Sequence, residues 1–315
     1  FDKPVFAGGF SLNGNGEMTG TIWVEESGML EGPVMITNTH SVGVVRDAVI
    51  QWRVSLGRAD DSGYWWSLPV VAETWDGYLN DINGFHVKPK HAFQALESAA
   101  AGPVVEGSVG GGTGMICYGF KGGIGSSSRR LPAPLEAYTV GVLVQANHGG
   151  RELLRIDGVP VGEAISDLQP QPEYSSLANS ILMVLATDAP LLDYQLDRLA
   201  RRAVRGLAKT GSISSNSSGD FALAFSTAGP LARRDFWTGE VNEQPSLDQS
   251  IIQGLLEAAA EAAEEAIVNA LFMATDMEGR DGHRIFALPI ERTLEILERH
   301  HRLFAEPPTE GSMDA

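Results

Sequence analysis

The sequence has one cysteine, no long apolar run and no basic cluster, and each shortage excludes a class of protein. A single cysteine, Cys117, rules out an internal disulfide and a cysteine-rich metal framework, which favours a cytoplasmic location. No stretch of about 18 apolar residues is present to span a bilayer, and no signal peptide is visible. Because the chain starts at Phe1 and a leader could precede it, a periplasmic location is the alternative.

Basic residues are also scarce. The chain carries 23 of them against 40 acidic residues, a net charge of −17, with no run of lysine or arginine. This balance argues against nucleic acids and anionic membranes as partners, and it suits a ligand with a cationic group. The hydrophobic content of 43% with 36 glycines in 315 residues is enough for a packed core with many tight turns.

Signals for cofactors and metals are weak. The glycine-rich stretch 107–114 resembles a phosphate cradle, but it lacks the Lys-Ser/Thr ending of a P-loop. We expect its glycines to let two backbone segments approach closely. No spacing makes a convincing metal site, and the pair His300 and His301 fits a helix surface. We therefore expect neither a cofactor nor a metal.

Periodicity predicts alternating strands and helices. Apolar residues recur at helical spacing in some stretches, and other stretches are short apolar runs bounded by turn residues. The predicted strands are 20–24, 32–37, 138–149, 181–186 and 221–227, and the predicted helices are 44–53, 91–101, 193–209, 252–274 and 288–303, with a further helix opened by residues 188–190.

The organising feature is the bond between Asn179 and Ser180. Upstream, residues 167–176 contain two prolines and have no apolar period, as expected of an exposed connection. Downstream, six apolar residues predict a strand that is buried on both faces. A loop therefore runs directly into a core strand at an Asn-Ser bond, which by itself is also compatible with an ordinary turn.

This junction has a chemical use. If the Ser180 hydroxyl attacked the carbonyl of Asn179, the peptide would become an ester, and water would open it. Ser180 would then be a new N-terminus whose α-amine, with a pKa near about 8, could take a proton from its own hydroxyl. One residue would supply both nucleophile and base.

Other polar residues end the predicted strands. Glu73, Trp75 and Tyr78 follow an apolar strand, where they form either a pocket wall for a substrate ammonium group or a solvated strand end. The side-chain amide of Asn147 ends a buried strand and could donate to an oxyanion. Ser218 and Asp220 stand two apart, so in an extended segment their side chains face the same side.

Several long motifs in order resemble those of the self-processing aminopeptidases, which include L-aminopeptidase D-alanine esterase/amidase and the β-peptidyl aminopeptidases. The similarity extends from about Asp2 to about His301. The motifs that carry it are residues 11–20, 36–43, 79–84, 186–191, 217–220 and 264–271.

The resemblance implies an α+β fold, a four-layer α-β-β-α sandwich, in a precursor that cleaves itself before a serine, as N-terminal-nucleophile enzymes do. Residues 1–179 would form one piece and residues 180–315 the other, together a single domain. Family members carry a further N-terminal segment before the position of Asp2, which this sequence does not contain. Relatives form tetramers, so a homotetramer of cleaved units is expected.

Carried over residue by residue, the resemblance also implies roles. Ser180 would be the nucleophile, Asn147 the oxyanion donor and Glu73 the acceptor of the substrate's free amine. Ser218 and Asp220 would orient Ser180 and relay its proton, and some members carry Glu where this chain has Asp220. Some members also place an aromatic hydroxyl near the oxyanion. Trp75 cannot donate that bond, which leaves Tyr78 as the candidate substitute.

The activity implied is that of a serine aminopeptidase, amidase and esterase acting on small peptides, amides and esters with a free amine. One alternative keeps the scaffold as an acyltransferase or a hydrolase of synthetic amide oligomers, although such relatives favour threonine as nucleophile. A second alternative is a non-catalytic binding protein that retains the scaffold.

Overall fold

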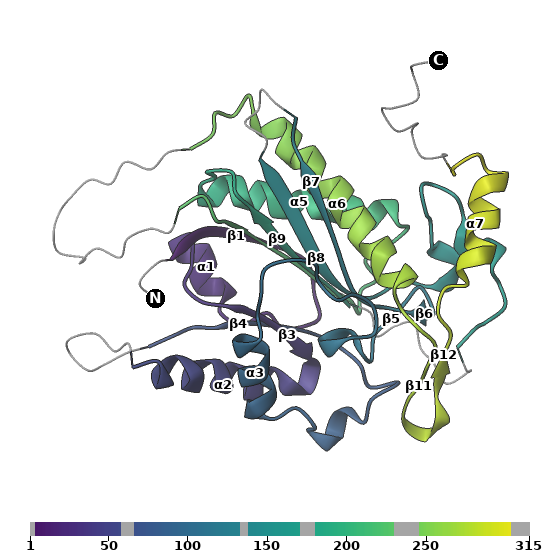
Figure 1. The fold of residues 1–315 in the computed structure, drawn as a ribbon, viewed down its shortest axis with the longest axis horizontal. Coiled ribbons are helices and arrows are strands. Elements are labelled where there is room, and N and C mark those ends of the chain that lie inside the picture. Colours follow the sequence, from purple (N-terminus) through teal and green to yellow (C-terminus); the bar gives the residue numbers. More distant parts are fainter. Residues whose placement is uncertain (1–3, 58–65, 133–137, 171–179, 230–245, 304–315) are drawn as a thin grey trace, which may run out of the picture.

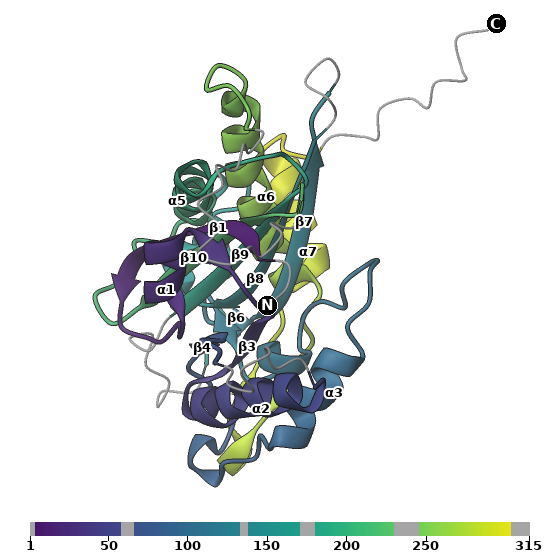
Figure 2. The same cartoon turned by 90° about the vertical axis from the view of Figure 1, so that its left-hand side faces the viewer.

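The computed structural model describes residues 4–57, 66–132, 138–170, 180–229 and 246–303. Helices and sheets form four layers, visible in Figure 1 and, after a quarter turn, in Figure 2. From one side to the other these are a helix pair, a six-stranded sheet, a two-stranded sheet and a second helix pair. The α-β-β-α sandwich implied by the sequence is confirmed, with a second sheet of only two described strands.

The six-stranded sheet has the order β2-β1-β10-β9-β8-β7. Only the central pair β9–β10 is parallel, whereas the other neighbours are antiparallel. The run predicted to be buried on both faces is β9, whose residues from Ile181 to Met183 are fully inaccessible to solvent. The strands are β1 Val5–Gly14, β2 Met29–Leu30, β7 Gly123–Arg130, β8 Thr139–Asn147, β9 Ser180–Thr187 and β10 Gly219–Ser226.

Two long helices cover the outer face of this sheet. Helix α5 (Asp193–Lys209) has the predicted bounds, and its leucines and alanines at helical spacing are buried against α6 (Ile252–Phe272) and the strands. Gly125 of β7 permits a close approach, because a Cβ there would lie 1.9 Å from the carbonyl oxygen of Ala266. Backbone contact of this kind fixes α6 to the sheet edge.

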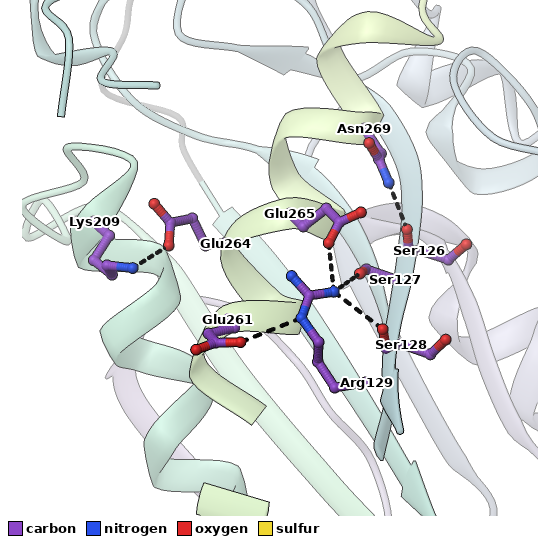
Figure 3. A network of polar contacts seen from close by, with 9 residues as sticks. All are labelled: Ser126, Ser127, Ser128, Arg129, Lys209, Glu261, Glu264, Glu265 and Asn269. Carbon is purple, nitrogen blue, oxygen red and sulfur yellow. Dashed lines mark hydrogen bonds and ion pairs between the residues drawn. The ribbon is translucent and has the colours of Figure 1, made fainter. Parts of the chain in front are cut away.

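Polar contacts tie the exposed side of α6 to both neighbours, as Figure 3 shows. Arg129 of β7 pairs with Glu261 at 3.3 Å and with Glu265 at 2.5 Å. On the other side, Glu264 accepts a hydrogen bond from Lys209 of α5. These pairs are partly exposed, so each contributes at most about 1 kcal/mol to stability. These pairs orient α6, whereas the packing of its apolar face against α5 and the sheet keeps it in place.

The second sheet pairs β3 (Val34–Asn38) with β4 (Val70–Thr74) in parallel. Helices α2 (Val42–Ser55) and α3 (Pro89–Glu97) pack on its outer side, and β4 contacts β9 across the sandwich. Apart from α1 (Thr21–Ser27) and the short 3-10 helices, the other described elements are β5 Ile116–Cys117, β6 Phe120–Lys121, α4 Val161–Ala164, β11 Met277–Glu278, β12 Arg284–Ile285 and α7 Ile290–Arg299.

The strand predicted at residues 20–24 is wrong, because this segment forms helix α1 (Thr21–Ser27). Its β-branched residues favour a strand locally, but Gly20 adopts a left-handed conformation, with φ of 73°, and turns the chain. In the helix, Val24 is buried with Ala7 and Leu30 while Ile22 faces solvent. Tertiary burial outweighs the local strand preference.

Other boundaries differ by less. Residues 188–190 do not open a helix directly, since α5 begins only at Asp193. The glycine-rich stretch 107–114 is a close-approach segment as predicted, because a Cβ on Gly112 would lie 2.6 Å from the backbone nitrogen of Ile124. Within the described ranges, no helix combines the length and the apolar character needed to cross a membrane.

Candidate active site

Ser180 lies at the first position of β9, between two neighbouring strands. The register places Asn147 of β8 on one side and Gly219 of β10 on the other. The Ser180 hydroxyl oxygen accepts a hydrogen bond from the backbone N–H of Gly219 at 3.2 Å, and the residue is 95% buried, with 5% exposure. The preceding residue, Asn179, lies outside the described residues, so cleavage of the Asn179–Ser180 bond stays a prediction.

The Asn147 side chain is held at both ends. Its Oδ1 accepts from the backbone N–H of Ile116, and its Nδ2 donates to the carbonyl oxygen of Trp75, both at 2.8 Å. These two bonds assign the oxygen Oδ1 and the nitrogen Nδ2 of the Asn147 amide. The amide nitrogen therefore faces the β4 side of the site, next to Ser180 in the register.

Ser218 and Asp220 meet on the far side of Ser180. The Ser218 hydroxyl donates to Asp220 Oδ1 at 2.5 Å, and both residues are almost fully buried. Burial raises the pKa of Asp220, although hydrogen bonds from Ser218, Ser214 and the backbone of Ile181 lower it in part. The two-residue spacing seen in the sequence thus produces a direct contact beside the strand that begins with Ser180.

Glu73 reaches the site from the second sheet. It is 2% exposed, its Oε1 accepts from the backbone N–H of Glu17 at 2.9 Å, and its Oε2 accepts from the Thr39 hydroxyl. Burial is the main cause that raises the pKa of Glu73, and the carboxylates of Glu17 and Asp76 raise it further. Glu73 is therefore not a solvated acid, and its role in binding a substrate ammonium group stays a prediction.

Two glycines lie between Glu73 and the backbone N–H that binds Ser180. A Cβ on Gly219, whose N–H binds Ser180, would lie 3.1 Å from the Cα of Gly16. A Cβ on Gly16 would in turn lie 2.9 Å from Glu73 Oε1. Since neither glycine has a side chain, the backbone at Gly16 packs directly against Gly219 and against the Glu73 carboxylate. Glycine is required here for close approach between the two sheets.

Of the two aromatic candidates, Trp75 borders the site and Tyr78 lies against another segment. The Trp75 carbonyl holds Asn147, and its half-buried ring lies over Gly77, where a Cβ would be 2.6 Å from Trp75 Cζ2. The Tyr78 ring stacks on His283 with centroids 4.3 Å apart, and its carbonyl contacts His283 Nδ1. The structure therefore groups Tyr78 with the turn before β12.

Several residues around the site were not singled out from the sequence. Thr39 and the backbone of Glu17 hold Glu73 although they are 34 and 56 residues away from it. The Gly219 N–H that binds Ser180 was also missed. The only available signal was that residues 11–20, 36–43 and 217–220, which contain them, lie in the motifs shared with the self-processing aminopeptidases.

Two further titratable side chains, His148 and Cys117, are buried next to Asn147. His148 is fully buried, which lowers its pKa to about 3, and burial raises the pKa of Cys117 to about 12. Both groups are therefore neutral near pH 7. In the part of the chain that the structure describes, no three His, Cys, Asp or Glu side chains are grouped to hold a metal ion.

Comparisons with known proteins identify the family. The family model "Peptidase family S58" matches residues 1–285. The chain is 48% identical to the β-peptidyl aminopeptidase BapA of Sphingosinicella microcystinivorans over 314 residues, which is 96% of this chain and 78% of that protein.

Solved structures are similarly close. A β-aminopeptidase from Burkholderia sp. has a TM-score of 0.86 at 47% identity, covering 95% of this chain and 82% of that chain. The L-aminopeptidase D-Ala-esterase/amidase of Ochrobactrum anthropi, described as a prototype of the serine aminopeptidases with a variant of the Ntn hydrolase fold, has a TM-score of 0.87 at 45% identity, covering 96% and 83%. With its sandwich fold and a family match over most of its length, the chain belongs to peptidase family S58 and is a hydrolase of the aminopeptidase type.

Proposed function

We propose that Ser180 is the nucleophile of an aminopeptidase that becomes active when the bond between Asn179 and Ser180 is cleaved. The observation that carries this proposal is the position of the Ser180 hydroxyl, which is buried at a strand start and receives the N–H of Gly219. Strand pairing on both sides fixes the backbone at this point, so a released α-amine would remain beside its own hydroxyl.

Turnover then follows ordinary acyl transfer. The Ser180 hydroxyl gives its proton to the α-amine and attacks the acyl carbon, and the collapsing tetrahedral intermediate releases the amine or alcohol with that proton. Water repeats the attack on the acyl-enzyme and frees the acid. The Nδ2 of Asn147, which is adjacent in the register, donates to the oxyanion, and one such preorganised donor contributes roughly 3 kcal/mol to barrier lowering.

Two buried carboxylates take different roles. Asp220, linked to Ser218 at 2.5 Å, orients that hydroxyl and supports proton movement at Ser180. Glu73 binds the ammonium group of the substrate, because its carboxylate is fixed by Thr39 and Glu17 and lies across the glycine contact from Ser180. This arrangement selects substrates with a free amine at the end that is cleaved off.

The substrates are small peptides, amides and esters. The relatives named above include β-peptidyl aminopeptidases and an enzyme named for L-amino acids and D-alanine derivatives. A carboxylate that recognises only the ammonium group is compatible with α- and β-amino acids alike, so we include both in the proposal.

Intact-mass and N-terminal analysis of the purified protein tests the proposal directly. We expect two pieces, residues 1–179 and residues 180–315, the second beginning at Ser180. The variant Ser180→Ala should remain one chain and lack hydrolase activity. An unbroken wild-type chain that hydrolyses amino-acid amides at full rate, or a new N-terminus at another residue, would refute it.

A further inference from the structure

The side-chain amide of Asn147 depends on one backbone carbonyl for its direction. Its Nδ2 donates to the carbonyl oxygen of Trp75 at 2.8 Å. A primary amide is planar and carries two N–H donors, so the first hydrogen bond fixes the direction of the second N–H. Whatever holds the Trp75 carbonyl in place therefore also directs the N–H that we assign to the oxyanion.

The peptide group between Trp75 and Asp76 is held at both ends. Its carbonyl oxygen accepts from Asn147, and its N–H is directed to the carboxylate of Asp76 itself. Because a peptide group is planar, a bond that fixes the N–H also fixes the carbonyl. A carboxylate bound to the N–H also polarises the peptide group, which makes the Trp75 carbonyl a stronger acceptor for Asn147.

The Asp76 carboxylate is anchored on two sides. The residue is 7% exposed, its Oδ1 accepts from Asn38 Nδ2 at 3.1 Å, and its Oδ2 accepts from Asn80 Nδ2 at 2.8 Å. The carbonyl oxygen of Asp76 accepts from the backbone N–H groups of Leu79 and Asn80, which closes the turn after β4. Since Asn38 is the last residue of β3, the carboxylate ties this turn to the neighbouring strand.

The same side chain packs against the segment that holds the other end of the Asn147 amide. A Cβ on Gly114 would lie 2.7 Å from the Cβ of Asp76, so only glycine leaves room there. Two residues further along the chain, the backbone N–H of Ile116 donates to Asn147 Oδ1 at 2.8 Å. Asp76 thus lies against both segments that orient the amide.

The burial of this acid is unfavourable for folding. Burial raises the pKa of Asp76, although hydrogen bonds from Asn38, Asn80 and its own backbone N–H, together with the nearby His40, lower it in part. Within the described ranges, no lysine or arginine forms an ion pair with Asp76. A buried carboxylate without a cation partner destabilises the folded state, and such groups concentrate at functional sites.

We propose that Asp76 is a positioning residue for the reaction at Ser180. Its carboxylate holds the Trp75 carbonyl, and through that carbonyl the Asn147 amide, in the orientation that donates to the oxyanion. Asp76 acts through Asn147 and not on the substrate, and this role rests on the oxyanion function proposed above for Asn147.

Steady-state hydrolysis of 4-nitrophenyl propionate tests this role. The ester has no amine, so the effect of the Asp76 charge on the pKa of Glu73 does not enter the measurement. Asp76→Asn keeps the volume of the side chain but replaces one oxygen with an NH2 group, which cannot accept from Asn38 or Asn80. We expect kcat per cleaved chain to fall roughly tenfold and KM to stay within about twofold. A purely structural role would lower the melting temperature and leave kcat per cleaved, folded chain unchanged.

A second variant covers the case in which Asp76→Asn disturbs the fold. Asn80 is half-buried, and Asn80→Ala removes one donor to Asp76 without burying a new polar group. For this variant kcat should fall about threefold or more, again with KM nearly constant. The matched control is Asn83→Ala, since Asn83 is exposed in the same loop and is not among the donors to Asp76. Its kcat should equal that of the wild type.

The variant Asn147→Ala distinguishes failure of the proposed function from failure of this role. We expect it to lower kcat about a hundredfold. Unchanged kcat for Asn147→Ala would reject the oxyanion function and the role of Asp76 with it. If Asn147→Ala lowers kcat while Asp76→Asn and Asn80→Ala match Asn83→Ala, or change KM alone, only the positioning role of Asp76 is overturned.

Discussion

The substitution Glu73→Gln removes one charge from the site with almost no change in volume. Glu73 is 2% exposed and accepts hydrogen bonds from Thr39 and from the backbone of Glu17. A glutamine keeps an oxygen for the Glu17 N–H, and its NH2 group can donate to the Thr39 hydroxyl after that hydroxyl rotates. The variant should therefore keep the side chain in place while losing the negative charge.

The size of the effect follows from the bond that is lost. A hydrogen bond to a charged group contributes about 1.5–3 kcal/mol, which corresponds to roughly 10- to 150-fold in kcat/KM. The loss should be confined to substrates with a free amine. We expect kcat/KM for alanine 4-nitroanilide to fall by this factor, and that for 4-nitrophenyl propionate, which has the same carbon chain without the amine, to stay within about twofold.

The assay compares the two substrates on the same preparation, after intact-mass analysis has shown equal extents of chain cleavage. An equal fall for both substrates would assign Glu73 a role in catalysis or folding instead of amine binding. If kcat/KM for the nitroanilide did not fall, the ammonium group of the substrate would bind at a group other than Glu73. Either outcome refutes the reasoning from the Glu73 geometry.

Thermal stability supplies a control, because Glu73→Gln should lower activity and yet leave the melting temperature unchanged or raise it. Because burial raises the pKa of Glu73 above 4.5, the folded state holds its proton to a higher pH than the unfolded state does. The stabilisation is present below that ordinary value and is lost as pH rises through the raised pKa. Glutamine carries no such charge, so at pH 7 the variant should melt at the same or a higher temperature, and the difference should shrink below pH 4.5. A clearly lower melting temperature at pH 7 would contradict this account.

Three further predictions test the rest of the structure. Asn147→Asp keeps the acceptor for Ile116 but loses the amide donor, so kcat should fall about a hundredfold, and unchanged kcat in steady-state assays would reject the oxyanion role. Ser218→Ala removes a hydrogen bond that lowers the pKa of Asp220, so the acidic limb of the kcat profile should move to higher pH, and an unmoved limb would separate Asp220 from catalysis. Buried Arg151 donates to five backbone carbonyls, so Arg151→Lys should lower the free energy of unfolding by about 3 kcal/mol or more. The control Arg292→Lys, at an exposed ion pair, should change it by less than about 1 kcal/mol. Similar denaturant midpoints for the two variants would contradict this difference.

Local periodicity was sufficient for the long helices, for several core strands and for one contact at the candidate site. The apolar run after Ser180 forms a strand, and the leucine and alanine spacing of residues 193–209 forms a helix with the predicted bounds. The pairing of Ser218 with Asp220 follows from the two-residue repeat of a strand. In each case the determining residues lie within a few positions of one another.

Tertiary structure decided the features that join distant parts of the chain. Segment 20–24 reads as a strand and folds as a helix, because Val24 is buried with residues of other elements. Glu73 became a buried acid through Thr39 and Glu17, and Asp76 came to accept a hydrogen bond from Asn38. The sequence alone determined the long helices, several core strands and the resemblance to a family, because propensity and periodicity are local. The register beside Ser180 and the approach of the two sheets depend on packing between residues far apart in the chain, which no local pattern encodes.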